Sequence, residues 1–376
     1  MAERLLGVDI GTSGVRAAVF EPNGTLVADA SVACGYDTPR PGWAEADPRE
    51  WWKAACGAIR AVGAKTELDA IAAMAVVGQA PTAVLVDERG APTRPAILWL
   101  DTRAEAEARE LGTHAYYLGP KLLWLSRHGG AGAETLLQSH SYIAFNLTGE
   151  TSVDASTAAL CVPLFDLASR KWMHDACDRV GIMRHMLPPV RGAHEVIGAV
   201  GGLAASETGL RKGTPVVAGG GDFAAATLGA GVVDPGEACL MLGTAGNLLV
   251  PLAAPGTDAR LINAHHVGAD VWLSLGGTLS GGAQEWLRRA LGMPSFEELD
   301  AEAATIAPGS EGLLFLPYLQ GERTPIWDVT ARGTYVGLSL AHGRGHLWRA
   351  LLEGIALSFV DCASILAAPL RELVAA

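Results

Sequence analysis

The sequence predicts an α/β protein made of two similar halves, and three observations support this fold class. The chain has 376 residues, 49% of them hydrophobic, which is enough for two domains with buried cores. Short apolar runs typical of strands alternate with longer segments that carry helix start and stop signals. A strand, glycine turn and strand occur in sequence twice, around Gly11-Thr12-Ser13-Gly14 and around Gly243-Thr244-Ala245-Gly246. A duplicated α/β unit explains this repeat, and we place the boundary near residue 230, between domains 1–230 and 231–376.

The first element is predicted to be an antiparallel meander of three strands. LLGVDI and VRAAVF flank the turn at 11–14, and PNG then leads into TLVADASVAC. Because a strand follows the glycines, the segment is neither a P-loop nor a dinucleotide-binding fingerprint, both of which need a helix there. Its backbone N–H groups can still approach a phosphate. The alternative for Asp9, at the end of the first strand, is that its carboxylate only binds turn amides.

The next segments alternate between helix and strand signals. Asp47 is a predicted N-cap, with Pro48 at the first helical position and Glu50 at the third. DAIAAMAVVG is a strand ending at Gly78 and Gln79, and TAVLVDERG and the run to AILWLD add strand material. PKLLWLSRHG and ETLLQSHSYIAFNLTG look helical, each stopped by glycine. GTPVVAGGGDFAAATLGAGVV predicts a strand, a glycine turn and a helix, for which Asp222 is an N-cap candidate.

Composition and charge exclude several classes of protein. The formal net charge of −12, with no run of Lys and Arg, leaves no basic face for nucleic acid or an anionic membrane. Six scattered cysteines without a C-x-x-C pair indicate reduced, mostly buried thiols, and the ten histidines show no metal-ligand spacing. No apolar run has the length of a membrane span, and no signal segment begins the chain, so we expect a cytoplasmic protein.

Taken together, these segments resemble the FGGY family of carbohydrate kinases within the actin-like ATPase superfamily, and the xylulokinases among them. The resemblance is carried by DIGTSGVR, PGWAEADPREWW, AILWLDTR, PKLLWL, VVAGGGD, LGTAG, FLPYLQGERTP and ARGTYVGLSLAHGRGHLWRALLEG. It implies two ribonuclease-H-like (actin-like ATPase) domains around a central cleft, and ATP-dependent transfer of the γ-phosphate to a hydroxyl of a ketose such as D-xylulose. The two glycine turns would face each other across the cleft and share the nucleotide.

The resemblance also implies roles for individual residues. Asp222 would be the general base that accepts a proton from the sugar hydroxyl, and Asp9 would hold the Mg²⁺ of ATP. The implied nucleotide-binding residues are Gly11, Thr12, Ser13, Gly14 and Arg16 of the first half, with Gly243, Thr244 and Gly246 of the second. The implied sugar-binding residues are Gln79, Trp99, Asp101 and Arg103, together with Asp222.

The sequence departs from the family at two places. Gln79-Ala80-Pro81-Thr82 stands where xylulokinases usually carry Gln-Met-His-Gly, whose Met and His contact the sugar. Alanine and proline provide no side-chain hydrogen bond, so the natural sugar is expected to differ from xylulose within the ketoses and polyols. The chain also ends at ILAAPLRELVAA, before the family's next strand, its adenosine-binding glycine segment and its closing helices. We therefore expect an incomplete second domain with an uncovered apolar face.

Several alternatives stay open at the level of sequence. Glu322 and Arg323 of the ERTP loop form either a surface ion pair or a structural support, which their place in the family's loop favours. Trp51, Trp52 and Trp99 are better explained as core residues than as sugar platforms. A sugar kinase competes with a non-catalytic sugar-binding remnant and with an actin-like ATPase that acts on protein partners, which the ERTP loop disfavours. A homodimer is expected only by family analogy.

Overall fold

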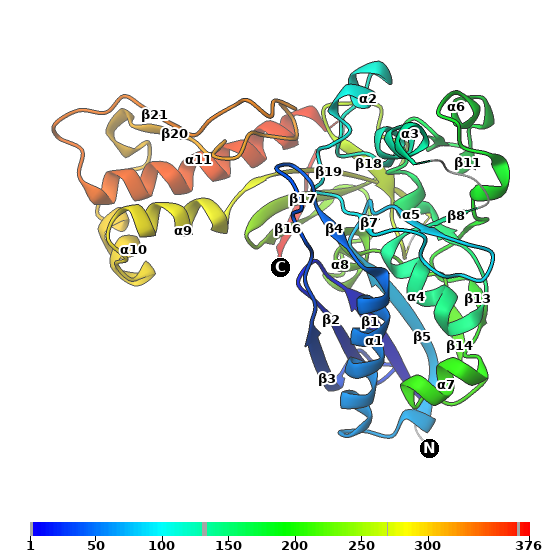
Figure 1. Ribbon diagram of the computed structural model, residues 1–376. Coiled ribbons are helices and arrows are strands. Elements are labelled where there is room, and N and C mark those ends of the chain that lie inside the picture. The colour runs from blue at the N-terminus through cyan, green and yellow to red at the C-terminus, as the bar shows by residue number, and fades with distance from the viewer. Residues whose placement is uncertain (1–2, 130–133, 269, 367–368) are drawn as a thin grey trace. The chain divides into compact units, whose positions relative to one another are not determined.

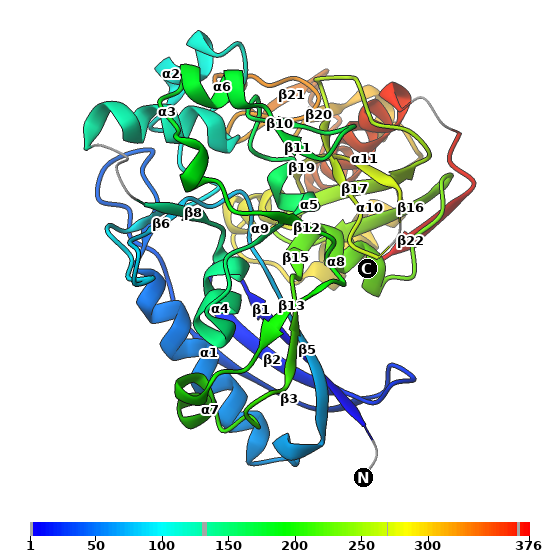
Figure 2. The same cartoon turned by 90° about the vertical axis from the view of Figure 1, so that its right-hand side faces the viewer.

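The computed structural model of the chain describes residues 3–129, 134–268, 270–366 and 369–376 (Figures 1 and 2). The chain forms two compact units. The first unit consists of residues 1–228 with 264–270, and the second of residues 229–263 with 271–376. Within the described ranges, no helix has both the length and the apolar character needed to cross a membrane.

A mixed sheet of seven strands forms the centre of the first unit, in the order β13-β14-β5-β1-β2-β3, with β15 also paired to β5. The predicted meander is confirmed, because β1, β2 and β3 are antiparallel neighbours. β5, β14 and β15 add parallel pairing on the other side of β1. The strands are β1 (Arg4–Ile10), β2 (Gly14–Phe20), β3 (Leu26–Ala33), β5 (Ile71–Gly78), β13 (Val196–Ala199), β14 (Pro215–Val217) and β15 (Gly220–Gly221).

Helices α1, α4 and α7 pack together against this sheet (Figure 2). The predicted start of α1 is confirmed, because the Asp47 side chain accepts the N–H of Arg49 and Pro48 occupies the first turn. Trp51 of this helix is fully buried among the alternate inward residues of β1, which confirms its assignment to the core. The helices are α1 (Pro48–Gly63), α4 (Ser139–Thr148) and α7 (Gly202–Thr208), and α8 (Asp222–Gly229) directly follows β15.

A second layer of the first unit has its own apolar core, in which Leu118, Leu122 and Ile97 are fully buried. It is built from short two-stranded sheets and helices. The strands are β4 (Glu45–Ala46), β6 (Val84–Val86), β7 (Ala96–Ile97), β8 (Thr135–Leu137), β9 (Val153–Asp154), β10 (Phe165–Asp166), β11 (Lys171–Trp172) and β12 (Val190–Arg191). The helices are α2 (Glu105–Glu110), α3 (Leu118–His128), α5 (Ala155–Ala158) and α6 (His174–Arg179), with short 3₁₀ turns at Leu68–Ala70 and Arg184–Met186.

The second unit contains a five-stranded sheet in the order β18-β19-β17-β16-β22. The predicted repeat of the strand, glycine turn and strand is confirmed by the antiparallel pair of β16 and β17. The long helix α11 packs on this sheet through Trp348, Leu351 and Phe359. The elements are β16 (Glu237–Leu242), β17 (Ala245–Leu252), β18 (Ile262–His265), β19 (Trp272–Leu279), β20 (Leu314–Leu316), β21 (Thr334–Val336), β22 (Glu372–Ala375), α9 (Gly281–Ala290), α10 (Phe296–Ala304), the 3₁₀ turn Ser310–Gly312, and α11 (Arg344–Ile365).

Two expectations from the sequence are corrected. The segment ETLLQSHSYIAFNLTG is not one helix, because Thr135–Leu137 pair with Val84–Val86 as a strand and the helix begins only at Ser139. The chain also does not end before the next strand of the second domain, because Glu372–Ala375 form β22, which runs parallel to β16. The six cysteines are free thiols, and all except Cys34 are buried, as predicted.

Candidate active site

The site is built at the ends of three parallel strands of the first unit. β5 lies between β1 and β15 and is parallel to both. Asp9 of β1 and Gly220 of β15 both pair with Val77 of β5, so they flank the same position of the central strand. Asp222 follows β15 directly, and two strand spacings, about 10 Å, separate the backbones that carry the two carboxylates. Residues far apart in the sequence therefore meet at one edge of the sheet, where parallel sheets commonly bind ligands.

Asp9 stands just before the first glycine turn. The turn is closed by a hydrogen bond of 2.9 Å from the Gly11 N–H to the Gly14 carbonyl. A Cβ on Gly14 would lie 2.9 Å from the Val32 carbonyl oxygen, so this position requires glycine. The Asp9 side chain is open to solvent on one side, but neighbouring protein atoms raise its pKa above the ordinary value, and the charge of Arg16 opposes this effect. A carboxylate beside exposed turn amides is suited to a phosphate-bound cation.

Thr12 links the glycine turn to two predicted sugar-binding residues. Its hydroxyl accepts the indole N–H of Trp99 at 3.3 Å and donates to Gln79 Oε1 at 3.3 Å. The Gln79 amide nitrogen also approaches the Gly11 carbonyl at 3.5 Å. Gln79 follows β5, between the two strands that carry the acids, and is only 1% exposed. The structure thus brings together Thr12, Gln79 and Trp99, whose proximity the sequence did not reveal.

Asp222 is the first residue of α8, and its Oδ1 accepts the N–H of Phe223 at 2.7 Å. Within the described ranges, Oδ2 accepts no hydrogen bond. Burial and, to a smaller extent, the negative charge of Asp9 raise the pKa of Asp222 to about 7. The helix-start and base interpretations of this residue are compatible, because the helix start holds the carboxylate in place. A carboxyl group with a pKa near neutrality is suited to accept a proton from a substrate.

Asp101 and Arg103 form a buried ion pair instead of an open pair of ligands. The Arg103 guanidinium donates to the Asp101 carboxylate at 2.7–3.0 Å and lies 2.7 Å from Glu45. It also stacks over Trp43, with its carbon 3.6 Å from the ring centre. Asp101 accepts the Ala44 N–H at 2.6 Å. The Asp101 and Arg103 side chains are 0% and 3% exposed, and their contacts fix the segment around Trp43. A direct contact of either residue with sugar stays a prediction.

Arg16 has a carboxylate partner in this structure. Its guanidinium donates to Asp29 of β3 at 2.7 and 3.1 Å, and both side chains are exposed. Arg16 is also the cross-strand partner of Asp9 in the β1–β2 hairpin. An exposed pair of this kind is weak and can exchange partners at little energetic cost. The predicted contact between Arg16 and phosphate stays a prediction.

The second glycine turn, in the second unit, supports the start of helix α9. The Gly243 carbonyl accepts the N–H of Gly281 at 2.9 Å, and the Thr244 carbonyl accepts the N–H of Gly282 at 2.9 Å. Gly246 has no room for a side chain, because a Cβ there would lie 2.4 Å from the Phe359 ring. The turn therefore satisfies amides of the first turn of a helix. Its predicted role in nucleotide binding stays a prediction.

The ERTP loop is a support of β19. Glu322 is buried and accepts the hydroxyl of Thr278 at 2.7 Å. Thr324 is also buried, and its hydroxyl accepts the Gly277 N–H at 2.7 Å. Since Thr278 pairs with Gly246 of the second glycine hairpin, the loop braces the strand beside that turn. This geometry matches the structural-support interpretation and not the surface ion pair.

The donor groups at the sheet edge fit a hard divalent cation. In the described part of the chain, no three His, Cys, Asp or Glu side chains converge into a metal-binding cluster. The open carboxylate of Asp9 would then be a single protein ligand, of the kind that suits an ion retaining water and phosphate oxygens. This arrangement is typical of a metal that arrives with a nucleotide.

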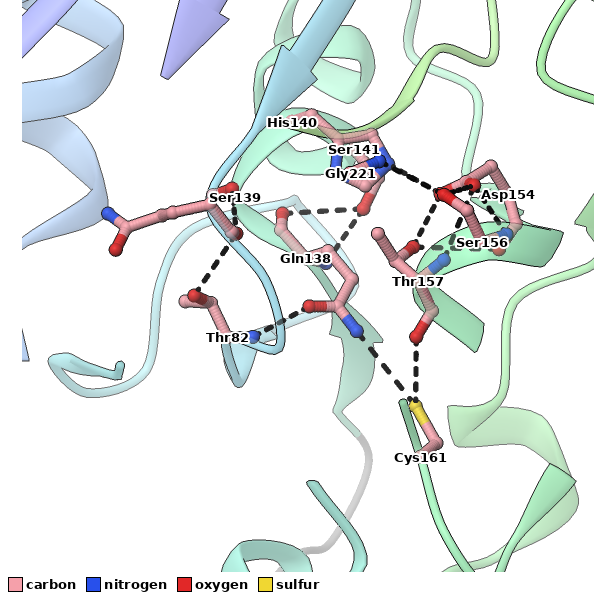
Figure 3. Close-up of polar contacts among 11 residues, drawn as sticks. Thr82, Gln138, Ser139, His140, Ser141, Asp154, Ser156, Thr157, Cys161 and Gly221 are labelled. Atoms are coloured by element: carbon pink, nitrogen blue, oxygen red, sulfur yellow. Dashed lines mark hydrogen bonds and ion pairs between the residues drawn. The ribbon is translucent and has the colours of Figure 1, made fainter. Parts of the chain in front are cut away.

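A buried polar cluster that no sequence motif indicated lies beside Gly221 (Figure 3). It joins the first turn of α4 to the start of α5. In this cluster, Asp154 caps α5 by accepting the N–H groups of Ser156 at 2.7 Å and Thr157 at 3.3 Å. The letters D-A-S-T could have indicated an N-cap. They could not have indicated that the cap lies against Gly221, which is 65 residues away from Ser156.

Comparisons with known proteins agree with this architecture. Residues 4–229 match the N-terminal domain model of the FGGY family of carbohydrate kinases, and residues 238–375 match its C-terminal domain model. The chain is 33% identical over 380 residues to the xylulose kinase of Escherichia coli (strain K12), covering 95% of this chain and 77% of that protein. It is 27% identical over 386 residues to the gluconokinase of Bacillus subtilis (strain 168), covering 94% and 75%.

A solved structure is similar over the same extent. The crystal structure of xylulose kinase from Rhodospirillum rubrum has a TM-score of 0.89 and 37% sequence identity, and covers 96% of this chain and 78% of that chain. Sugar kinases of this family use ATP and a divalent metal ion. From the paired acids at the sheet edge, the two matching glycine hairpins and these similarities, we conclude that the chain belongs to the FGGY family of carbohydrate kinases.

Proposed function

We propose that the protein transfers the γ-phosphoryl group of ATP to a hydroxyl of a xylulose-like ketose, with Asp222 as the general base. The observation that carries this proposal is the placement of Asp9 and Asp222 on either side of the end of β5, with the pKa of Asp222 raised to about 7. The loop that begins at Gln79 emerges between them. A sugar bound at this loop would lie between the base and the metal-bound phosphate.

The proposed chemistry is an in-line displacement. Asp222 takes the proton of the sugar hydroxyl while the hydroxyl oxygen attacks the γ-phosphorus, and the bond from the γ-phosphorus to the ADP oxygen breaks. Oδ2 of Asp222 is the acceptor, because Oδ1 is occupied by the Phe223 N–H. The Mg²⁺ held beside Asp9 would neutralise phosphate charge when bound. The protein groups mainly position the reactants, which is the main contribution to catalysis in phosphoryl transfer.

The proposed nucleotide contacts come from both glycine hairpins. N–H groups of residues 11–14 would approach the terminal phosphates, and Arg16 would exchange Asp29 for phosphate oxygens. Gly243, Thr244 and Gly246 would contribute from the second unit. The shared Thr12 hydroxyl would couple occupancy of the phosphate turn to the positions of Gln79 and Trp99, because all three are hydrogen-bonded.

The sugar is proposed at the level of its class. Ala80 and Pro81 are buried and bring no side-chain hydrogen-bonding group to the loop. The Tyr116 hydroxyl lies 3.5 Å from the Ala80 carbonyl, and Gln138 Oε1 accepts the neighbouring Thr82 N–H at 2.7 Å. Discrimination between hydroxyl patterns therefore depends on Gln79, Trp99 and backbone groups. Relatives named for xylulose and for gluconate make both sugar types necessary members of a substrate panel.

The test is an ADP-release assay coupled to NADH oxidation, run with ketoses, aldoses, polyols and gluconate. We expect sugar-dependent ADP release that is largest with a ketose. Asp222→Asn should lose turnover by at least about 1,000-fold while calorimetry shows sugar and Mg²⁺-ATP binding largely kept. Asp69→Asn, an exposed acid outside the site, is the control. Full turnover in Asp222→Asn would remove this residue from its proposed role.

A further inference from the structure

We propose that Ser156, oriented by Asp154, is a positioning residue that holds Gly221 and thereby fixes the catalytic carboxylate of Asp222. This inference rests on the proposed function of Asp222 and concerns two side chains, Ser156 and Asp154, that lie outside β1, β5 and β15. Figure 3 shows Gly221, Ser156 and Asp154 joined by dashed contacts in a buried cluster. The inference follows from the hydrogen bonds, the charge and the space around that cluster.

The first step is the hydrogen bond to the backbone before Asp222. The N–H of Gly221 donates to Ser156 Oγ at 3.1 Å. Gly221 immediately precedes Asp222, and β15, which it ends, is only two residues long. Such a short strand has few sheet hydrogen bonds to hold it. A side-chain acceptor for Gly221 therefore contributes a large part of the restraint on the backbone that carries the base.

The second step is the orientation of the Ser156 hydroxyl. A hydroxyl has a single proton to donate and can accept with its lone pairs. The Ser156 hydroxyl donates to Asp154 Oδ2 in a short hydrogen bond, and so its lone pair is left for Gly221. Asp154 and Ser156 are each 1% exposed, so water does not compete for these contacts. The direction of the Ser156 hydroxyl is thus set by the carboxylate behind it.

The third step is the charge of Asp154. Burial alone would raise the pKa of this carboxyl, but contacts from His140, Ser156 and Thr157 outweigh burial and hold the pKa below its ordinary value. His140 Nε2 lies 3.1 Å from Asp154 Oδ1, and the Thr157 hydroxyl donates to the same oxygen at 2.5 Å. Asp154 is consequently ionised and can only accept hydrogen bonds at neutral pH. Ser156 must then donate to it.

The glycines before Asp222 fit closely against the start of α5. A Cβ on Gly220 would lie 3.2 Å from Asp154 Oδ2 and 3.2 Å from Ser156 Oγ. A Cβ on Gly221 would lie 3.2 Å from Thr157 Cγ2. The glycines before Asp222 therefore allow its backbone to pack directly on the Asp154 cap. From the sequence alone these glycines predict only a turn.

The start of α4 also holds the loop at residues 79–82, where the sugar is proposed to bind. Ser139 Oγ donates to the Gln79 carbonyl at 2.8 Å, and Gln138 Oε1 accepts the Thr82 N–H at 2.7 Å. His140, the next residue of α4, faces Asp154. The first turn of α4 therefore contacts both the loop that would bind sugar and the cluster that holds the base. This arrangement gives the two parts of the site a common rigid support.

The test compares Ser156→Ala with Ser152→Ala in the full-length protein. Ser152 is a matched control, because its hydroxyl is buried and, in the described part of the chain, has no hydrogen-bond partner. For Ser156→Ala we expect kcat to fall about 10- to 100-fold, with KM for sugar and ATP within about twofold, because only the position of the base changes. Ser152→Ala should keep the wild-type kcat.

A second variant keeps the test decisive if the alanine change impairs folding. Ser156→Cys keeps the shape of the side chain with a somewhat larger terminal atom but offers only a weak acceptor, so the folded variant should show a similar fall in kcat. Wild-type kcat in a folded Ser156→Ala or Ser156→Cys variant would overturn the inference, and so would a change confined to KM. These outcomes are distinct from failure of the proposed function, which would appear as full turnover in Asp222→Asn.

Discussion

Replacing Asp222 by Asn should stabilise the folded protein even as it abolishes turnover. Asn has nearly the same shape, and its Oδ1 can still accept the Phe223 N–H that Asp222 accepts. The Asn side chain is neutral, so folding does not have to bury a negative charge near Asp9. The Asp222 carboxylate is therefore expected to destabilise the fold at neutral and alkaline pH, which is common at functional sites.

The magnitude follows from the pKa of Asp222, which rises from 3.8 to about 7 on folding. A rise of about three pKa units, at 1.36 kcal/mol each, corresponds to about 4 kcal/mol as an upper value. The folded-state pKa is the higher one, so the folded protein favours the protonated form of Asp222. The stability that this form contributes is fully present below the unfolded pKa of 3.8 and is lost as the pH rises through about 7. The free energy of unfolding of Asp222→Asn should thus exceed that of wild type by about 2–4 kcal/mol at about pH 8 and by about 1–2 kcal/mol at about pH 5.

The assay is urea unfolding followed by circular dichroism at both pH values. Since the chain has two units, the comparison uses the midpoint of the transition that reports the first unit. Asp69→Asn controls for the loss of an exposed carboxylate. Asp154→Asn should change stability in the opposite direction and destabilise the protein. The lowered pKa of Asp154 means that its ionised form stabilises the fold above the unfolded pKa. An Asp222→Asn variant that is less stable than wild type near about pH 8, or whose gain does not grow with pH, would refute this reasoning.

Three further outcomes are expected. In a pH series of the coupled assay, kcat/KM for sugar should fall below an apparent pKa near about 7, because Asp222 must be ionised to act as base; a flat profile down to about pH 5 would contradict this. Asp101→Asn should lower stability in urea unfolding by at most about 3–5 kcal/mol, because it removes one of the two carboxylates that neutralise the buried Arg103 and leaves Glu45; an unchanged midpoint would argue against a structural role for the pair. Gly219→Ala should lower the free energy of unfolding by more than about 1 kcal/mol, seen as a lower melting temperature, because its φ is +72° and its Cβ would lie 1.7 Å from the Val76 carbonyl oxygen; Gly213→Ala, also at positive φ but with open space, should lose less.

Local patterns in the sequence predicted much of the fold. The strands around both glycine turns, the start of α1 at Asp47 and the burial of Trp51 depend on short-range alternation, capping and turn chemistry, and all are confirmed. The segment from Thr135 to Thr148 shows where this fails. Its first residues have no local preference strong enough to resist pairing with Val84–Val86, and so a partner about 50 residues away decides their conformation.

For the candidate site too, some features could be predicted from the sequence and others depend on the tertiary structure. The sequence by itself determined which chemical groups are present: the acid at the end of the first strand, the acid that follows the glycines at 219–221, the glycines that leave room for close approach, and the family to which they belong. The tertiary structure decided which of them meet. Only the pairing of β1, β5 and β15 places Asp9 and Asp222 on either side of Gln79, and only the packing of α5 against β15 brings Ser156 to Gly221. Burial and the neighbouring charge then set the pKa of Asp222, and both depend on atoms that are close in space and distant along the chain.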